Sequence, residues 1–329
     1  MNLKIGIVGL PNVGKSTLFN ALTNAGALAA NYPFATIEPN VGIVPVPDER
    51  LDVLAKMYET DKVVSATVEF VDIAGLVAGA SKGEGLGNKF LAHIRECQAI
   101  CHVVRAFKNN DIVRADNQPE DDIIKQAKDD IDIINLELEL ADEETKAKIA
   151  AKRKKDPADE FIPYLTDKPV IYMFNVDEQG LTDQELQSQL KDLVKPAKAI
   201  FVNAKLEEEM SGMTRAERKE FLQSYGVKHD ALEELIKAAY DTLNLQSFLT
   251  AGKKECRAWT IKKGSTAPEA AGTIHTDFER GFIAAQICNY DDLKTLGSEQ
   301  AVKAAGKLRT EGKTYIMQDG DVVEFKFNV

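Results

Sequence analysis

The sequence contains little cysteine, histidine or tryptophan. Of its 329 residues, four are cysteine, four are histidine and one is tryptophan. The cysteines lie among apolar residues, and no two of them form a C-x-x-C pair: Cys97, Cys101, Cys256 and Cys288. This spacing favours buried, reduced thiols over a disulfide framework or a metal site.

Long apolar runs are also absent. None reaches the roughly 18 residues that a membrane-spanning helix needs. The chain opens with Met1-Asn2-Leu3-Lys4 and continues directly into an apolar stretch, so we expect no signal peptide and no membrane partner. Apolar and charged contents of 44% and 28% are typical of a globular protein, and the length allows two domains. We therefore expect a cytoplasmic protein.

The net charge of −11 argues against DNA as a partner. The charge is uneven, however, because the chain from Gly252 onward carries 12 Lys and Arg against 11 Asp and Glu. Overall charge therefore does not decide whether RNA is bound. The basic tract Lys152-Arg153-Lys154-Lys155 is either a solvated helix end or an RNA contact.

One motif near the amino terminus predicts a phosphate site. Residues Gly9–Ser16 fit the pattern G-x-x-x-x-G-K-S, after an apolar run at Lys4–Val8 and before an amphipathic run at Thr17–Leu22. In this strand–loop–helix context, backbone N–H groups converge on phosphate oxygens. We expect Lys15 to lie between the β- and γ-phosphates and the Ser16 hydroxyl to bind Mg²⁺.

Apolar runs alternate with helical patterns, which predicts an α/β fold with a doubly wound, mostly parallel sheet. The predicted strands are Leu3–Val8, Thr67–Ala74, Ile100–Phe107, Pro169–Val176 and Ala199–Asn203. The predicted helices that follow are Asp183–Leu193, Arg215–Tyr225 and Asp230–Leu243.

An insertion interrupts this alternation at residues 119–165. Its apolar positions repeat every seven residues: Ile124, Ile131 and Leu138, with Ala127, Ile134 and Ala141 offset by three. This pattern, followed by a turn signal at Asp156-Pro157, predicts a short helical hairpin that projects from the sheet.

The last part of the chain, 244–329, has a different pattern and predicts a small α+β domain of β-grasp-like type. Strands are expected at Arg257–Ile261, Phe282–Tyr290 and Val322–Val329, and a helix at Ser298–Leu308. Asp319-Gly320 predicts a hairpin turn between a strand at Tyr315–Gln318 and the last strand. The nucleotide-binding domain would then occupy residues 1–243.

Further residues complete the predicted nucleotide site. Asp72 follows an apolar strand and can hold Mg²⁺ through water, while the N–H of Gly75 can reach the γ-phosphate. Thr36, in a proline-bounded loop, is a candidate third ligand of the metal. The Gly79–Gly87 run predicts a loop that orders with nucleotide.

The water-positioning group is a separate question. Many nucleotide hydrolases carry glutamine directly after D-x-x-G, but here that position is Leu76. His93 is the nearest residue in sequence with suitable chemistry; a structural role is the equally weighted alternative.

The segment after the fifth strand predicts the base. P-loop proteins that are specific for guanine carry the motif N-K-x-D in this segment, where this chain has Asn175-Val176-Asp177-Glu178. The longer Glu178 displaces the carboxylate from the guanine edge, whereas the Asn175 amide can serve the adenine amino group and N7. ATP is therefore expected over GTP, and Asn203-Ala204-Lys205 would close the base pocket.

Taken together, these motifs resemble the Obg-like ATPase family, also called YchF, over nearly the whole chain. The matching segments are Gly9–Thr17, Asn31–Asn40, Asp72–Leu76, Gly79–Asn88, His93–Cys97, Asn175–Glu178, Ala251–Ile261, Ile274–Phe282 and Gln318–Asp321. The last three resemble the TGS domain of the family, and the first part resembles its OBG-type G domain.

The resemblance implies a P-loop ATPase of the translation-factor class that associates with the ribosome, as the 50S subunit or the 70S particle. ATP would contact Asn12, Val13, Gly14, Lys15, Ser16, Thr17 and Val176, with Mg²⁺ at Ser16 and Thr36. The resemblance also implies a catalytic role for His93. The family's hairpin is usually much longer than the one in this chain.

Two alternatives remain open. One is a GTPase in which Glu178 replaces the aspartate; the other is a ribosome- or rRNA-binding adaptor that senses ATP and scarcely hydrolyses it, as Leu76 would favour. Asn12 in the phosphate loop could also bring K⁺ to the β–γ bridge.

Overall fold

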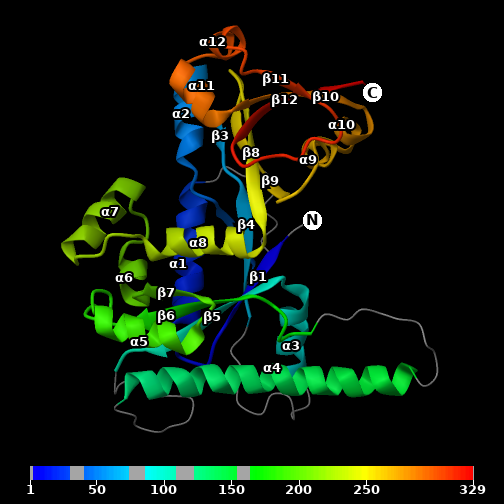
Figure 1. The fold of residues 1–329 in the computed structure, drawn as a ribbon. Helices are drawn as coiled ribbons and strands as arrows, with labels where there is room; N and C mark the ends of the chain where they lie inside the picture. The colour runs from blue at the N-terminus through cyan, green and yellow to red at the C-terminus, as the bar shows by residue number, and fades with distance from the viewer. Residues whose placement is uncertain (1–2, 30–40, 74–85, 109–121, 154–163, 329) are drawn as a thin grey trace. The chain divides into compact units, whose positions relative to one another are not determined.

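The computed structural model describes residues 3–29, 41–73, 86–108, 122–153 and 164–328 (Figure 1). The chain divides into two compact units. The N-terminal unit comprises residues 1–44 and 68–239, and the C-terminal unit comprises residues 45–67 and 240–329. The sequence predicted one boundary near residue 243; the two units differ from that prediction in the placement of residues 45–67.

A six-stranded sheet forms the centre of the N-terminal unit. Its strand order is β2 (Val41–Pro45), β4 (Thr67–Asp72), β1 (Lys4–Val8), β5 (Ala99–Ala106), β6 (Val170–Val176) and β7 (Lys198–Val202). The neighbours from β4 to β7 are parallel, which confirms the predicted doubly wound sheet. Register pairs Ile7 with Asp72, so the carboxyl ends of β4 and β1 lie side by side. It pairs Val8 with His102, so β5 continues beyond the end of β1 to Ala106.

Seven helices are described that lie in this unit or begin in it: α1 (Lys15–Ala29), α3 (Leu86–Glu96), α4 (Ile123–Arg153), α5 (Gln184–Val194), α6 (Ala204–Glu209), α7 (Arg215–Ser224) and α8 (Ala231–Thr242). Local capping explains several of their starts. Asp183 accepts hydrogen bonds from the N–H groups of Glu185 and Leu186, and Thr214 forms a capping box with Glu217.

Helix α4 contains the heptad repeat of the predicted insertion. It is one continuous helix, and its seven-residue repeat faces the sheet: Ala127 and Ile131 are buried in a cluster with Phe174 and Leu190. The start of the repeat therefore packs α4 on strands β5 and β6, and the second arm of the hairpin stays a prediction. The predicted bend at Asp156-Pro157 lies outside the described residues.

The C-terminal unit is built on a mixed sheet of six strands. Their order is β11 (Arg309–Glu311), β10 (Phe282–Asn289), β12 (Asp321–Phe327), β8 (Leu245–Ala251), β9 (Cys256–Lys262) and β3 (Val63–Val64). The described helices are α2 (Glu49–Tyr58), α9 (Ala267–Ile274), α10 (Thr276–Arg280), α11 (Tyr290–Leu296) and α12 (Glu299–Ala304). Residues 45–67 belong here because β3 pairs with β9 and α2 packs on β8 and β9.

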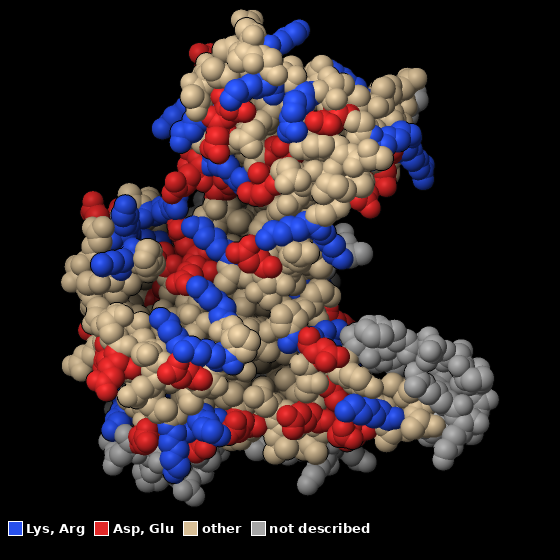
Figure 2. Space-filling view, in the orientation of Figure 1, with Lys and Arg blue, Asp and Glu red and all other residues tan. Residues whose placement is uncertain are grey.

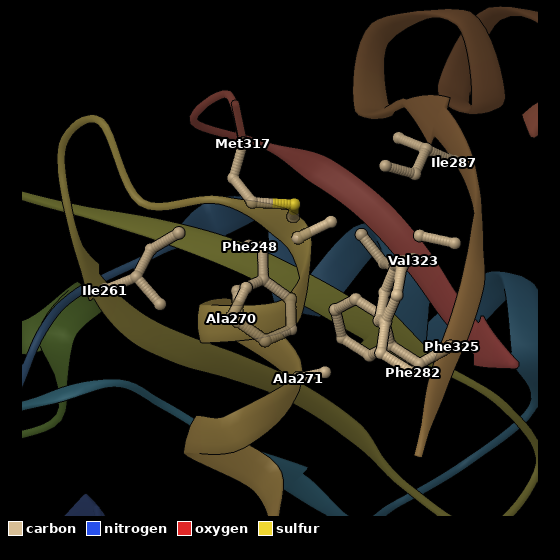
Figure 3. Close-up of a cluster of buried hydrophobic side chains, with 11 residues drawn as sticks. Phe248, Ile261, Ala270, Ala271, Phe282, Ile287, Met317, Val323 and Phe325 are labelled. Atoms are coloured by element: carbon tan, nitrogen blue, oxygen red, sulfur yellow. The ribbon is translucent and has the colours of Figure 1, made fainter. Parts of the chain in front are cut away.

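This unit has its own hydrophobic core, shown in Figure 3. Phe248 and Phe325 meet edge to face with ring centroids 5.6 Å apart, and Phe282 lies 6.1 Å from Phe325. Buried alanines of α9, among them Ala270 and Ala271, pack against these rings. Each fully buried phenylalanine contributes about 1.5–3 kcal/mol to the stability of the unit.

Two predictions for this unit were wrong. Residues Tyr315–Gln318 do not form a hairpin strand before β12. Their backbone pairs with the start of α9 instead: Met317 N–H donates to Ser265 and Ala267 N–H donates to Tyr315. The predicted helix Ser298–Leu308 is also shorter, since α12 ends at Ala304.

All four cysteines are buried free thiols, as predicted. Within the part of the chain that the structure describes, no helix is both long and apolar enough to cross a membrane.

Candidate nucleotide site

The phosphate loop connects the end of β1 to the start of α1. Its turn requires left-handed backbone at two positions, because Asn12 has φ 63° and Gly14 has φ 96°. Glycine is also needed for space: a Cβ on Gly9 would lie 2.6 Å from the carbonyl oxygen of Val103, and one on Gly14 would lie 2.4 Å from Nδ2 of Asn175. The first turn of α1 then offers N–H groups that have no acceptor within the helix.

Lys15 and Asp72 meet beside this loop. Lys15 Nζ lies 3.5 Å from Asp72 Oδ1, and both side chains are mostly buried. Register explains the encounter, because Asp72 ends β4 next to Ile7 of β1 and Lys15 begins the helix that follows β1. The predicted cation and the predicted acidic residue are therefore neighbours.

One observation indicates that the predicted magnesium ligands can bind a cation. Asp72 Oδ1 is buried and has no hydrogen-bond partner among the described residues, although the ammonium group of Lys15 is near. A buried carboxylate oxygen of this kind favours a cation or an ordered water as its missing partner. Ser16, the second predicted ligand, is exposed in the first turn of α1, where Thr17 follows it.

The side chain of Asn175 contacts two segments of the protein. Its Nδ2 donates to the carbonyl of Val13 at 2.9 Å, and its Oδ1 accepts from the N–H of Ala204 at 3.0 Å. The side chain is buried, so the amide joins the phosphate loop to the start of α6. Each end of the amide makes one of its two possible hydrogen bonds here, and its predicted contact with adenine stays a prediction.

The rest of the predicted base segment is held by two further contacts. Asn203 Nδ2 donates to the carbonyl of Val176 at 2.9 Å, while its Oδ1 caps α6 by accepting from Leu206 N–H. Asp177 Oδ1 accepts from the N–H of Gly180 at 2.8 Å, which closes a turn. The sequence predicted Asn203 at the base pocket but did not show that it holds Val176 and caps α6.

Glu178 and His93 both face solvent. Glu178 lies just beyond β6 and is exposed. Helix α3 buries Leu91 and Ile94 and exposes His93, so the helix presents that ring to the surface. Thr36, Gly75, Leu76 and the Gly79–Gly85 part of the glycine loop lie outside the described residues. Their predicted roles, like the catalytic role of His93, stay predictions.

The sheet, the loop and the Lys15–Asp72 pair define a P-loop nucleotide-binding domain. Two family profiles match the chain: one described as 50S ribosome-binding GTPase matches residues 4–176, and the C-terminal YchF profile, described as a protein of unknown function, matches residues 245–328. The chain is 47% identical to proteins named "Ribosome-binding ATPase YchF" from Haemophilus influenzae and Bacillus subtilis, over all of both chains. It belongs to the YchF family.

Solved structures support the same family and fold. The structure of the Schizosaccharomyces pombe YchF GTPase matches with a TM-score of 0.86 at 36% identity, over 99% of this chain and 98% of that one. A GTP-binding protein from Pyrococcus horikoshii matches with a TM-score of 0.60 at 20% identity, over 99% of this chain and all of that one, which shows a common fold.

This chain is also shorter than its bacterial relatives. The alignment with the Haemophilus influenzae protein spans 369 positions, about 40 more than the 329 residues here.

Proposed function

We propose that this protein binds and hydrolyses ATP at the phosphate loop with Mg²⁺ bound, and that it associates with the ribosome. The observation that carries the proposal is the buried Lys15–Asp72 pair beside a loop whose backbone is shaped for phosphate. The names of the curated relatives, ribosome-binding ATPases, support both parts of it.

The chain's own residues would act mainly by positioning charge. N–H groups of the loop and the first turn of α1 bind phosphate oxygens, and Lys15 turns from Asp72 to the β- and γ-phosphates. Asp72, Ser16 and Thr36 would hold Mg²⁺, which neutralises charge on the phosphates when it is bound. The N–H of Gly75 would contact the γ-phosphate.

ATP is proposed over GTP for a reason at the base segment. A guanine-reading carboxylate must be held in place, whereas Glu178 is exposed beyond the end of β6. The adjacent Asp177 carboxylate already closes the turn at Gly180. The Asn175 amide also binds Val13 and Ala204, so it would share adenine recognition with the backbone of Val176, which Asn203 holds. The two GTPase descriptions among the similar proteins make GTP the second candidate.

The proposed base preference is tested by titrating fluorescent ATP and GTP analogues against the protein with Mg²⁺. We expect ATP to bind more tightly than GTP. Lys15→Ala should weaken ATP binding about 10- to 150-fold, because a hydrogen bond to a charged group contributes about 1.5–3 kcal/mol. Lys128→Ala, an exposed lysine on α4 that pairs with Asp132, is the matched control. Tighter binding of GTP, or no binding of either nucleotide, would contradict the proposal.

Hydrolysis is tested by phosphate release over many turnovers, with and without 50S subunits or 70S ribosomes. His93→Ala should leave ATP affinity intact and slow turnover, if the ring positions the attacking water. Unchanged turnover would remove His93 from the mechanism. Turnover close to zero in every condition, with ATP bound, would favour the adaptor that only senses ATP. Repeating the assay in Na⁺ and K⁺ tests whether K⁺ acts near Asn12.

A ribosome-binding role is compatible with the surface. On the face seen in Figure 2, basic and acidic side chains are interspersed, and neither sign dominates. An acidic chain of this kind would meet the ribosome through local contacts, to protein or rRNA, instead of through its net charge. The cytoplasmic location that the sequence predicted would follow from this association.

A further inference from the structure

The polypeptide passes between the two units three times, at residues 44/45, 67/68 and 239/240. The first two passages are the ends of a single segment, residues 45–67. This segment leaves from β2 and returns into β4, the strand that ends at Asp72. Two strands of the nucleotide-binding sheet are therefore continuous in sequence with one element of the C-terminal unit.

Strand β2 is itself tightly fitted to the helix of the phosphate loop. A Cβ on Gly42 would lie 2.2 Å from the Cγ2 atom of Thr23 and 3.3 Å from the ring of Phe19, both on α1. Glycine is thus required for this close approach. A displacement of β2 would therefore move α1, and a displacement of β4 would move Asp72.

Segment 45–67 is fixed within the C-terminal unit at several points. Val46 N–H donates to the carbonyl of Ala66 at 2.7 Å, which holds the two ends of the segment together. Cys256 N–H donates to the carbonyl of Lys62 at 2.9 Å, extending the pairing of β3 with β9. Tyr58 donates to Glu299 at 2.5 Å. The segment is therefore part of the sheet and helix packing of the unit and not a free linker.

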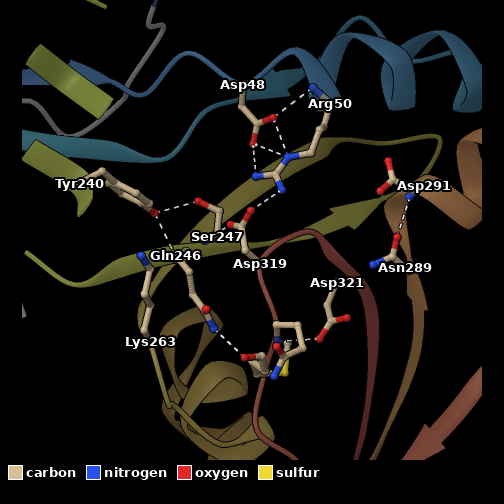
Figure 4. A network of polar contacts seen from close by, with 12 residues as sticks. Asp48, Arg50, Tyr240, Gln246, Ser247, Lys263, Asn289, Asp291, Asp319 and Asp321 are labelled. Carbon is tan, nitrogen blue, oxygen red and sulfur yellow. Dashed lines mark hydrogen bonds and ion pairs between the residues drawn. The ribbon is translucent and has the colours of Figure 1, made fainter. Parts of the chain in front are cut away.

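A polar network begins beside the first passage (Figure 4). Arg50 forms a fork on Asp48, with Nε and Nη2 each donating at 2.8 Å, and its Nη1 donates to Asp319 at 2.8 Å. The other carboxylate oxygen of Asp319 accepts from the N–H of Ser247 on β8 at 3.0 Å. A planar guanidinium that bridges two carboxylates in this way fixes its neighbours strongly.

The same network reaches the third passage. Ser247 Oγ lies 2.7 Å from the hydroxyl of Tyr240, the first residue of α8 that belongs to the C-terminal unit. The turn after Asp319 is shaped for this arrangement: Gly320 has φ 81°, and a Cβ there would lie 2.8 Å from Arg50 Nη1. Two of the three chain passages thus lie beside one set of contacts, and the hydrogen bond from Val46 to Ala66 ties the second passage to the first.

We propose that this crossing network, formed by Asp48, Arg50, Tyr240, Ser247 and Asp319, couples nucleotide binding to the C-terminal unit. Arg50 is a positioning residue: it holds segment 45–67, and through β2 and β4 the segment acts on α1 and Asp72. The inference rests on the proposed function, since it needs a nucleotide at the phosphate loop. Coupling is reciprocal, so a partner that binds the C-terminal unit would change the affinity for ATP.

Hydrogen exchange followed by mass spectrometry on the full chain tests the proposal, with and without Mg²⁺ and ATP. In the unsubstituted protein, ATP should slow exchange in β8 and β9 by about fivefold or more, the lower end of usual coupling between sites. Arg50→Ala should abolish this difference while the protein still binds ATP. Asp319→Asn, a milder change, should reduce it too.

Lys263→Ala is the matched control, because it removes an exposed ion pair with Asp241 elsewhere in the same unit. It should keep the full ATP effect. If Arg50→Ala and Asp319→Asn fold, bind ATP and keep the effect, the coupling is refuted; so it is if the unsubstituted protein binds ATP without any change in β8 and β9. Failure to bind ATP at all would instead refute the proposed function, and the inference with it.

Discussion

His102 is a buried histidine in the middle of β5, with its ring 5.3 Å from that of Tyr172. Its Nε2 has no hydrogen-bond partner among the residues that the structure describes. Burial lowers the pKa of His102 from its ordinary value of 6.5 to about 3. The folded protein therefore holds a neutral ring where the unfolded chain can take up a proton.

This residue makes stability depend on pH. Between pH 6.5 and 3 the unfolded chain binds more protons at this position than the folded one, so acid favours unfolding. The stability is fully present above pH 6.5 and falls by up to about 1.4 kcal/mol per pH unit below it. We expect His102→Leu to remove this part of the pH dependence, measured by exchange of β5 amides at pH 7, 6 and 5.

The comparison between the two proteins isolates the histidine. Glu207, whose pKa burial raises to about 7, is present in both and its titration cancels in the difference. His229→Gln, at an exposed position, controls for the loss of any histidine. Parallel pH profiles for the unsubstituted protein and His102→Leu would show that the buried ring does not control acid stability.

At the scale of elements, α4 is held to the returning chain by one carboxylate. Asp142 is buried and accepts three hydrogen bonds, from the N–H groups of Leu165 and Thr166 and from the Thr166 hydroxyl, at 2.8–2.9 Å. Arg95 at the end of α3 also donates to Thr145, one turn further along α4. The base of the insertion is therefore tied both to its own return and to α3.

Asp142→Ala should destabilise this base markedly. It leaves two backbone N–H donors without their acceptor, at about 1–3 kcal/mol for each that stays buried. Hydrogen exchange should accelerate in the last turns of α4 and at residues 164–168. Glu143→Ala, which removes only an exposed ion pair with Lys146, should change stability little and serves as the control. Equal effects of the two substitutions would show that Asp142 does not hold the insertion.

Elements with strong local patterns were predictable from the sequence. The apolar strands β1, β4, β5, β6 and β7 lie within two residues of their predicted bounds, because a strand covered on both faces is apolar throughout. The partner of an amphipathic face was not predictable in the same way. The repeat in α4 is equally suited to a second helix or to a sheet, and only the fold decides between them.

The site shows the same division. The loop Gly9–Ser16 and Asp72 could be found because their chemistry is local to one turn and one strand end. The hydrogen bonds of Asn175 to Val13 and Ala204 join residues far apart in the sequence, so no motif could show that its amide also binds protein. The contact between Arg50 and Asp319 joins residues 269 positions apart, and no sequence pattern predicted it.

For the whole molecule, the relevant fact is that each unit has its own core. The cluster around Phe174 belongs to the N-terminal unit, and the cluster around Phe248 to the C-terminal unit. Separate cores allow separate unfolding transitions, and a ligand stabilises only what it binds or is coupled to. The unfolding temperatures measured by calorimetry can therefore show whether ATP stabilises one unit or both.

We expect ATP with Mg²⁺, at about 100 times its Kd, to stabilise the N-terminal unit by about 2.7 kcal/mol. For a unit of this size that is an increase in Tm of about 5–11 °C. The crossing network should carry part of this increase to the C-terminal transition, and Arg50→Ala should confine it to the N-terminal one. In Lys15→Ala the stabilisation at the same ATP concentration should fall to about 0.3–1.4 kcal/mol, because ATP binding is 10- to 150-fold weaker. A shift of both transitions that is as large in Arg50→Ala as in the unsubstituted protein would mean that the units communicate by another route.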